Sequence, residues 1–230
     1  MIVIHTIQGS DDWLAARAGV ITASRFVDAR AKLSRKSKTG NVGDPAASSI
    51  DYAWTVAMER IAGKPLDQTF TTWQMKRGND LEPEARMAYE MKTGLLAGES
   101  GLILTDDSTF GYSSDGLVGD DGLIEIKCPA NCQKIGNIWC SPETATGEYI
   151  DQIQGGLWIT GRKWCDFVMY CPWLESVGKE LFIKRVERDD DYIEELESDL
   201  IEFNRLVENY HNRIIQQTTE IEPLKKQEAA

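Results

Sequence analysis

The chain has 230 residues, of which 42% are hydrophobic and 27% charged, a composition typical of one large globular domain. No run approaches the roughly 20 apolar residues of a membrane span, and no signal peptide is visible, so we expect a cytoplasmic protein without a membrane partner. The net charge of −12 argues against a uniformly basic surface, yet Lys and Arg are frequent in the first 40 residues, which fits a basic cleft within an acidic exterior.

The N-terminal region is predicted to begin with two helices. An acidic pair, Asp11 and Asp12, is placed to cap a helix over residues 13–18. A second helix begins at Thr22 or Ser24 and is expected to run to about residue 35. Residues 34–47 then form a basic loop that contains two glycines.

The middle of the chain changes from helical to β-like patterning. Apolar residues at helical spacing predict helices over residues 48–63 and 78–94, each ending at a glycine. Residues 101–127 carry short β-like runs, and the sequence GDDG at 119–122 predicts an antiparallel hairpin. The remaining predicted elements are a helix over 148–161, strands over 163–170 and 180–186, and a long amphipathic helix over 191–216.

This order of elements predicts an α/β (α+β) fold in which helices flank one central mixed β-sheet. We expect a single domain over residues 1–217 and a disordered tail over residues 218–230. The five cysteines, at 128, 132, 140, 165 and 171, do not suggest a secreted disulfide framework, because their number is odd. Structural thiols in a reduced cytoplasm are expected; a zinc or iron–sulfur site is the alternative, although no fourth ligand stands at a familiar spacing.

The strongest chemical signal is a pair of carboxylates with a lysine on the predicted hairpin: Asp115 in SSDGL, and Glu125 and Lys127 in LIEIKCP. Side chains alternate along a strand, so Glu125 and Lys127 share one face while Ile126 points to the other. Two acids and one amine on one face suit a hard divalent cation and an activated water. The alternative is two surface carboxylates with a salt-bridging lysine.

In the metal-assisted interpretation, Asp115 and Glu125 bind Mg²⁺, and the backbone carbonyl of Ile126 is a third ligand. Lys127 orients or deprotonates the attacking water, and we expect the metal's charge to lower the pKa of Lys127. Glu82, on the predicted helix upstream, is placed to reach a water beside the metal; the alternative is a solvated helix carboxylate.

Two further segments add candidate contacts for nucleic acid. Gln152 and Gln154 lie on the helix after the sheet core and are candidates to contact the phosphate backbone or a base edge; both are otherwise solvated amides. Arg17 and Ser24, in WLAARAGVITAS, are candidates to bind a terminal phosphate, because anions are favoured near helix N-termini. The alternative is a surface arginine and a helix cap.

Together these segments resemble the bacteriophage lambda exonuclease family, also called the YqaJ-type viral recombinase family, within the PD-(D/E)xK nuclease superfamily. The segments that carry the resemblance cover roughly residues 12 to 190: WLAARAGVITAS, RGNDLEPEAR, SSDGL, GLIEIKCP and YIDQIQGGLWITGRKWCDFVMYCP. The resemblance implies a Mg²⁺-dependent 5′-to-3′ exonuclease that digests one strand of linear double-stranded DNA from a 5′-phosphorylated end. It implies that the enzyme leaves a 3′ single-stranded overhang for single-strand-annealing recombination.

The resemblance also implies a role for each matching residue. Asp115, Glu125 and the Ile126 carbonyl match the metal ligands, and the catalytic residues are matched by Lys127, Glu125, Asp115, Glu82 and Gln152. The pocket for the 5′-phosphate is matched by Arg17, Ser24 and Ser113. Met75 falls where the family has an apolar wedge that separates the terminal base pair, with core packing as the alternative. Arg35 is the candidate for gripping the duplex.

The partners implied by the resemblance are double-stranded DNA ends, a single-strand annealing protein and two further copies of the chain in a homotrimeric ring. Two Mg²⁺ ions are expected, with Mn²⁺ as a substitute, in the cytoplasm of a bacterium or of a phage-infected host. Ser114 departs from the proline of the superfamily motif, and Gly155-Gly156 replaces bulkier residues, which we expect to loosen that helix. The competing functions are another PD-(D/E)xK endonuclease and an inactive DNA-end-binding protein.

Overall fold

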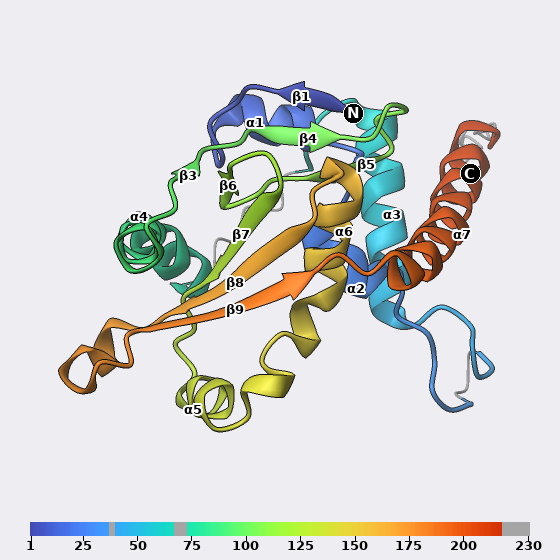
Figure 1. Ribbon diagram of the computed structural model, residues 1–230. Helices are drawn as coiled ribbons and strands as arrows, with labels where there is room; N and C mark the ends of the chain where they lie inside the picture. The colour runs from blue at the N-terminus through green and yellow to red at the C-terminus, as the bar shows by residue number, and fades with distance from the viewer. Residues whose placement is uncertain (37–39, 67–72, 218–230) are drawn as a thin grey trace, which may run out of the picture.

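The computed structural model describes residues 1–36, 40–66 and 73–217, except for the side chains of Gln74 and Met75. Two β-sheets form its centre and helices cover them (Figure 1). One sheet has four strands in the order β1-β4-β5-β2, and the other has five in the order β3-β6-β7-β8-β9. The predicted α/β class with mixed strand pairing is confirmed, but the expectation of one sheet is wrong. The predicted tail at 218–230 lies outside the described residues.

The four-stranded sheet joins the N-terminus to the middle of the chain. Its strands are β1 (Ile2–Ile4), β2 (Ile21–Thr22), β4 (Leu102–Leu104) and β5 (Phe110–Tyr112). β1 pairs antiparallel with β4, and β2 pairs parallel with β5. The β-like run at 101–127 divides between the sheets because the chain bends after β5. Ser114 holds that bend, since its Oγ donates to the Gly116 carbonyl at 2.7 Å and accepts from the Gly116 amide at 3.1 Å.

The five-stranded sheet contains the predicted hairpin. Its strands are β3 (Ala97–Gly98), β6 (Gly116–Val118), β7 (Gly122–Lys127), β8 (Trp164–Tyr170) and β9 (Leu181–Glu187). β6 pairs antiparallel with β7, and the register sets Gly116 opposite Ile124, which confirms the hairpin. β7 continues in parallel with β8, where Glu125 lies opposite Phe167. β7 is therefore a central strand, and its side chains are buried on both faces except at its last residue.

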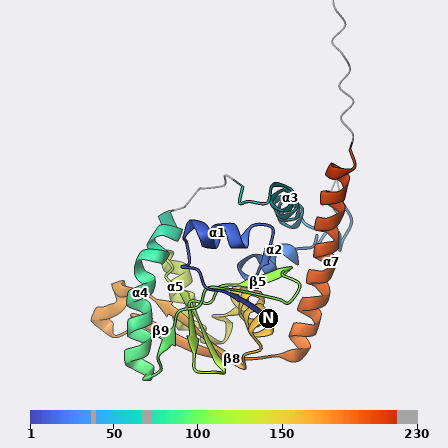
Figure 2. The ribbon, with the colours of Figure 1, turned by 90° about the horizontal axis from the view of Figure 1, so that it is seen from above.

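Helices cover this sheet on two sides (Figures 1 and 2). On one face, Ala85 and Tyr89 of α4 pack with Ile124 and Val168 of the sheet. On the other face, α6 packs with α2 and α7. The helices are α1 (Asp11–Arg17), α2 (Phe26–Ala29), α3 (Ala47–Ala62), α4 (Trp73–Thr93), α5 (Cys132–Cys140), α6 (Ile150–Thr160) and α7 (Asp190–Ile215). Short 3-10 turns lie at η1 (Ala23–Arg25), η2 (Pro142–Thr144), η3 (Gly147–Tyr149) and η4 (Pro172–Val177).

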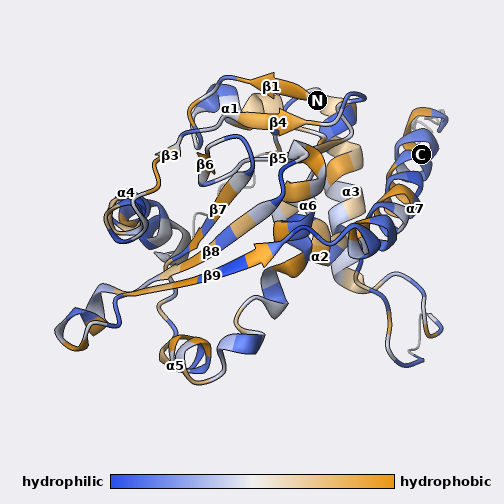
Figure 3. Ribbon diagram, viewed as in Figure 1, coloured by the Kyte–Doolittle hydropathy of each residue, from blue (hydrophilic) through white to orange (hydrophobic). Residues whose placement is uncertain are grey.

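The long C-terminal helix α7 packs through one apolar stripe, as its sequence predicts. Both polar and apolar residues occur along its length (Figure 3). The buried residues recur at spacings of three and four, from Ile193 to Val207, which places them on one face of the helix. Tyr52 of α3 stacks on Phe203, with ring centroids 5.2 Å apart. In the N-terminal half of α7, Asp199 accepts from Arg30 at 2.9 Å. In the described part of the chain, no helix combines the length and apolarity needed to cross a membrane.

Three local predictions need correction. The helix expected from Thr22 or Ser24 to about residue 35 is only η1 followed by α2, because the chain turns back and the Ala46 amide donates to the Ala31 carbonyl. α1 begins at Asp11 rather than 13, with Ser10 as the capping side chain. α4 begins at Trp73, five residues earlier than predicted. Nothing in the sequence pattern predicted α5.

The glycine pair in α6 does not loosen that helix. α6 continues through both residues to Thr160, and both are buried. A Cβ on Gly155 would stand 2.5 Å from the Phe26 ring, and a Cβ on Gly156 would stand 2.7 Å from the Tyr112 ring. The absent side chains therefore allow α6 to press against α2 and β5. The expectation of a looser helix is wrong, because the space that a bulkier residue would take is filled by two aromatic rings.

Candidate active site

The hairpin brings Asp115, Glu125 and Lys127 together at the end of the five-stranded sheet. Asp115 precedes β6, and Glu125 lies on β7, where it is only 1% exposed. The Lys127 Nζ donates to Glu125 Oε1 at 2.7 Å. Asp115 Oδ2 accepts the Ile126 amide proton at 2.6 Å, which ties it to the same strand. The three side chains therefore share one site, and Ile126 lies between them in sequence with its own side chain buried.

Glu125 is held by three donors from three elements. Besides Lys127, the Gln152 Nε2 of α6 donates to Oε1 at 2.5 Å, and the Tyr112 hydroxyl of β5 donates to Oε2 at 3.0 Å. Lys127 Nζ also donates to Gln152 Oε1 at 3.2 Å. Charge-assisted hydrogen bonds of this kind fix a buried carboxylate in one orientation. Gln154 has a different role, since it joins α6 to the connection between β9 and α7 through the Glu187 carbonyl and the Asp189 amide.

The electrostatics of this cluster are those of a site with too few positive charges. Burial and the neighbouring Glu125 raise the pKa of Asp115 well above its usual value. Burial opposes the charge on Lys127, but Glu125 and Asp115 together raise the pKa of the lysine. Without a cation, the pKa of Lys127 is raised and not lowered as the sequence led us to expect. The lowering would require the charge of a bound cation. A divalent cation would favour the charged form of Asp115.

The donor set fits a hard cation that keeps several waters. Asp115 Oδ1 has no hydrogen-bond partner within the described ranges, so one carboxylate oxygen is available. Across residues 1–36, 40–66 and 73–217, no three His, Cys, Asp or Glu side chains form a group that could hold a metal by themselves. A metal here must complete its shell with backbone oxygens or water, as Mg²⁺ readily does. The same finding gives the alternative zinc site no support among these residues; the thiols of Cys132 and Cys140 are exposed.

Glu82 lies near this cluster but pairs elsewhere. It stands on α4 and accepts from the Arg86 guanidinium at 2.9 Å. Its charge adds to the rise in the pKa of Asp115, which places it within electrostatic reach of the site. Glu82 therefore lies at the edge of the cluster, not inside it.

A second cluster surrounds Arg17. The Arg17 Nη2 donates to Thr22 Oγ1 at 3.0 Å and to Ser24 Oγ at 3.1 Å. Burial lowers the pKa of Arg17. Among the described residues, no carboxylate forms a salt bridge with it. A half-buried arginine that is hydrogen-bonded to hydroxyls and, among the described residues, to no carboxylate is a suitable site for an anion.

Ser113 joins this second cluster through Trp13. The Trp13 Nε1 donates to Ser113 Oγ at 2.9 Å, and the Arg17 guanidinium carbon lies 4.6 Å from the centroid of the Trp13 ring. The structure therefore links Arg17, Ser24 and Ser113 in one neighbourhood, although they come from three elements.

One pocket of about 300 Å³ is lined by residues of both clusters. Its wall includes Ser24 from the second cluster and Lys127 and Gln152 from the first, together with Tyr149 and the acidic residues Glu148 and Asp151. The Lys127 ammonium lies 5.2 Å from the Tyr149 ring centroid. A molecule in this pocket would touch both the serine beside Arg17 and the lysine beside the carboxylates.

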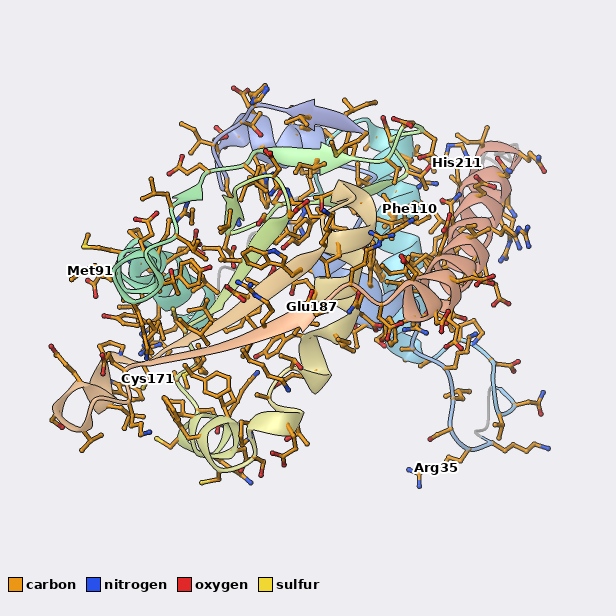
Figure 4. All side chains as sticks on the ribbon, in the orientation of Figure 1. Arg35, Met91, Phe110, Cys171, Glu187 and His211 are labelled. Carbon is orange, nitrogen blue, oxygen red and sulfur yellow. The ribbon has the colours of Figure 1, made fainter. Side chains whose placement is uncertain are left out.

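Two sequence candidates lie apart from this arrangement. Arg35 is exposed on the loop between α2 and α3, and its side chain points away from the body of the molecule (Figure 4). Met75 lies in α4, but its side chain is outside the described part of the structure. Sequence reasoning missed Trp13, Thr22, Tyr112 and Tyr149. Only their positions within the quoted motifs or next to them could have drawn attention to them, since each is otherwise a common core or cap residue.

Comparisons with known proteins agree on one family. A family model described as a YqaJ-like viral recombinase domain matches residues 12–163. The alkaline exonuclease LHK-Exo from Laribacter hongkongensis is 37% identical, with a TM-score of 0.75, over 90% of this chain and 96% of that one. The structure of LHK-Exo in complex with dAMP has a TM-score of 0.76 at 37% identity, over 89% and 96% of the two chains.

A third solved structure shares the fold. The phage-related exonuclease from Haemophilus somnus 129PT has a TM-score of 0.63 at 16% identity, over 85% of this chain and 95% of that one. A search of curated proteins finds no match.

Proposed function

The chain belongs to the family of YqaJ-like viral recombinase domains and is a nuclease, and we propose that it digests one strand of linear duplex DNA from a 5′-phosphorylated end in the presence of Mg²⁺. The observation that carries this proposal is the shared pocket, whose wall contains Ser24 beside Arg17 and also Lys127 and Gln152. If Arg17 held the terminal phosphate, the adjacent phosphodiester of the same strand would lie at the carboxylates. An exonuclease that depends on a 5′-phosphate requires this juxtaposition, and an endonuclease does not.

The carboxylate cluster would hold the metal through Asp115 and Glu125, with the Ile126 carbonyl as a further ligand. When bound, one or two Mg²⁺ ions (or Mn²⁺) would neutralise phosphate charge and favour ionisation of the attacking water. Gln152 fixes both Glu125 and Lys127, because its amide donates to the former and accepts from the latter. Lys127 is thereby aimed into the pocket, where it orients the attacking water. Glu82 supports this water from α4.

The arginine cluster would bind the end of the digested strand. Arg17, Ser24 and Ser113 supply guanidinium and hydroxyl donors, which suit the three acceptor oxygens of a terminal phosphate. The charge of Arg17 is partly desolvated and lacks an acidic partner among the described residues, so an anionic group would stabilise it. Removal of nucleotides from the 5′ end leaves a 3′ overhang, which is the substrate of a single-strand annealing protein.

The remaining parts of the proposal concern assembly. Three copies would form a ring around the duplex, with the acidic surface outside and basic residues such as Arg35 toward the DNA. Met75 would part the terminal base pair. The enzyme would act in the bacterial cytoplasm, where duplex ends and annealing proteins are found together. A size of roughly three times the 25.8 kDa chain mass, measured by light scattering, would support the ring, and a monomer would contradict it.

The test is digestion of linear duplexes that carry either a 5′-phosphate or a 5′-hydroxyl, with Mg²⁺ or with EDTA. We expect release of mononucleotides that is fast from phosphorylated ends, absent with EDTA, and accompanied by a protected 3′ strand. Closed circular DNA should remain intact. Cutting of closed circles would favour an endonuclease, and tight end binding without nucleotide release would favour an inactive end-binding protein.

A further inference from the structure

Trp13 contacts two of the three side chains proposed to hold the terminal phosphate. It lies on α1 and is 8% exposed. Its indole Nε1 donates to Ser113 Oγ, which is 100 positions away in the sequence, and its ring faces the guanidinium of Arg17. The Nη2 of Arg17 also donates to the hydroxyls of Thr22 and Ser24. Trp13 is thus the one side chain in the described structure that links Ser113 to Arg17.

The indole fixes which way the Ser113 hydroxyl can act. An indole N–H is only a donor, so Ser113 Oγ accepts in this contact and keeps its own proton. Across the described ranges, that proton has no recorded acceptor. A hydroxyl that accepts from a buried neighbour has its proton free for a ligand oxygen. The contact with Trp13 therefore makes Ser113 a donor, which is the role that an anion requires.

The ring of Trp13 limits the positions of Arg17. The two residues are four positions apart on α1, so their side chains lie on the same face of the helix. The guanidinium carbon lies 4.6 Å from the ring centroid, within the range of a cation–π contact. Both hydroxyl contacts of the guanidinium use Nη2, which leaves N–H groups on its other nitrogens for a ligand.

We infer that Trp13 is a positioning residue for the terminal phosphate. Its N–H donates to Ser113 and so leaves the Ser113 hydroxyl as a donor to the ligand, and its ring packs against the Arg17 guanidinium. This inference rests on the proposed phosphate pocket. It gives Trp13 a role beyond core packing with Val20, Leu102 and Leu104. A core residue would support stability without affecting which kind of DNA end the enzyme prefers.

Trp13→Phe tests the inference because it keeps an aromatic ring and removes only the N–H donor and part of the volume. The readout is the ratio of affinities for short duplexes with 5′-phosphate and 5′-hydroxyl ends, measured by fluorescence anisotropy in EDTA. We expect this ratio to fall roughly fivefold, the usual effect of one neutral hydrogen bond. Since the N–H acts through Ser113, adding Trp13→Phe to Ser113→Ala should lower the ratio much less than it does alone.

Trp139→Phe is the matched control, because the Trp139 Nε1 is buried and has no hydrogen-bond partner among the described residues. We expect this control to leave the ratio unchanged. Trp13→Leu, which removes both the N–H donor and the aromatic ring, is the second variant if the phenylalanine variant does not fold. A wild-type ratio in the folded Trp13 variants, or full additivity with Ser113→Ala, would overturn the role of Trp13. If the wild-type protein itself shows no preference, the proposed phosphate pocket fails as well.

Discussion

The two clusters that meet in the shared pocket have opposite character. Around Glu125, two buried carboxylates face one lysine, and burial raises the pKa of Asp115. Around Arg17, a half-buried cation contacts two hydroxyls and an aromatic ring, and burial lowers its pKa. Each cluster leaves one sign of charge uncompensated by the protein. The first suits a cation and the second suits an anion, so a phosphate end together with a metal would satisfy both.

The largest expected effect tests the carboxylate cluster alone. Glu125→Gln removes the charge proposed to bind the metal but keeps the shape, and we expect nucleotide release to fall about 10³-fold or more, given the several kcal/mol that a metal supplies. The measurement is release from 5′-phosphorylated linear duplex in Mg²⁺. The preference for 5′-phosphate in EDTA should be unchanged. The same substitution at the exposed Glu195 of α7 is the control, and a lost preference in Glu125→Gln would show that the clusters are not independent.

The reciprocal change tests the arginine cluster. Arg17→Met keeps most of the side-chain length and removes the charge, so the preference for a 5′-phosphate should fall about 10- to 100-fold, in line with loss of hydrogen bonds to a charged group. The rate on 5′-hydroxyl ends should change little. Arg205→Met, at an exposed position of α7, serves as the matched control. An equal loss on both kinds of end would mean that Arg17 supports the fold or binds DNA generally.

A third change tests the packing of α6 against Tyr112, the residue that donates to Glu125. In Gly156→Ala the new Cβ would stand 2.7 Å from the ring of Tyr112, whose hydroxyl holds Glu125. We expect a loss of about 1–3 kcal/mol in the free energy of unfolding, measured with urea, because the core becomes overpacked. Nucleotide release should fall as well, since Tyr112 is displaced from Glu125. Gly136→Ala, at a position in α5 with nothing within 4 Å, should be neutral or stabilising.

The smallest expected effect concerns the contact of α7 with Arg30 and Lys32. Burial opposes the charge of Asp199, but hydrogen bonds from Lys32 and Arg30 lower its pKa below the usual value. A lowered folded-state pKa stabilises the protein above the unfolded pKa, near 4, and this contribution is lost as the pH falls through the folded value.

Asp199→Asn should therefore cost about 1 kcal/mol of unfolding free energy at pH 7. The difference from wild type should shrink as the pH is lowered below about 4. Urea unfolding at several pH values measures it. The preference for 5′-phosphate ends should stay at the wild-type value, so a changed preference would mean that α7 influences the arginine cluster.

Sequence patterns determined the parts of this protein that depend on near neighbours. The GDDG turn and the alternation of Glu125 and Lys127 follow from the geometry of a hairpin, and both appear in the structure. The helix over 148–161 ends where predicted because Gly161 adopts a left-handed conformation, with φ of 68°, that favours glycine. Such features need only a few residues, so the local sequence contains the information.

Only the tertiary structure decided how distant segments meet. Nothing in the local pattern indicated that residues 101–127 divide between two sheets, that Tyr112 donates to Glu125, or that Trp13 donates to Ser113. The glycine pair in α6 gave the wrong expectation for the same reason, since its effect depends on the rings of Phe26 and Tyr112. Close packing couples residues by volume and direction, and these depend on the whole fold. The sequence therefore determined which chemical groups are present, and packing decided which of them share one pocket.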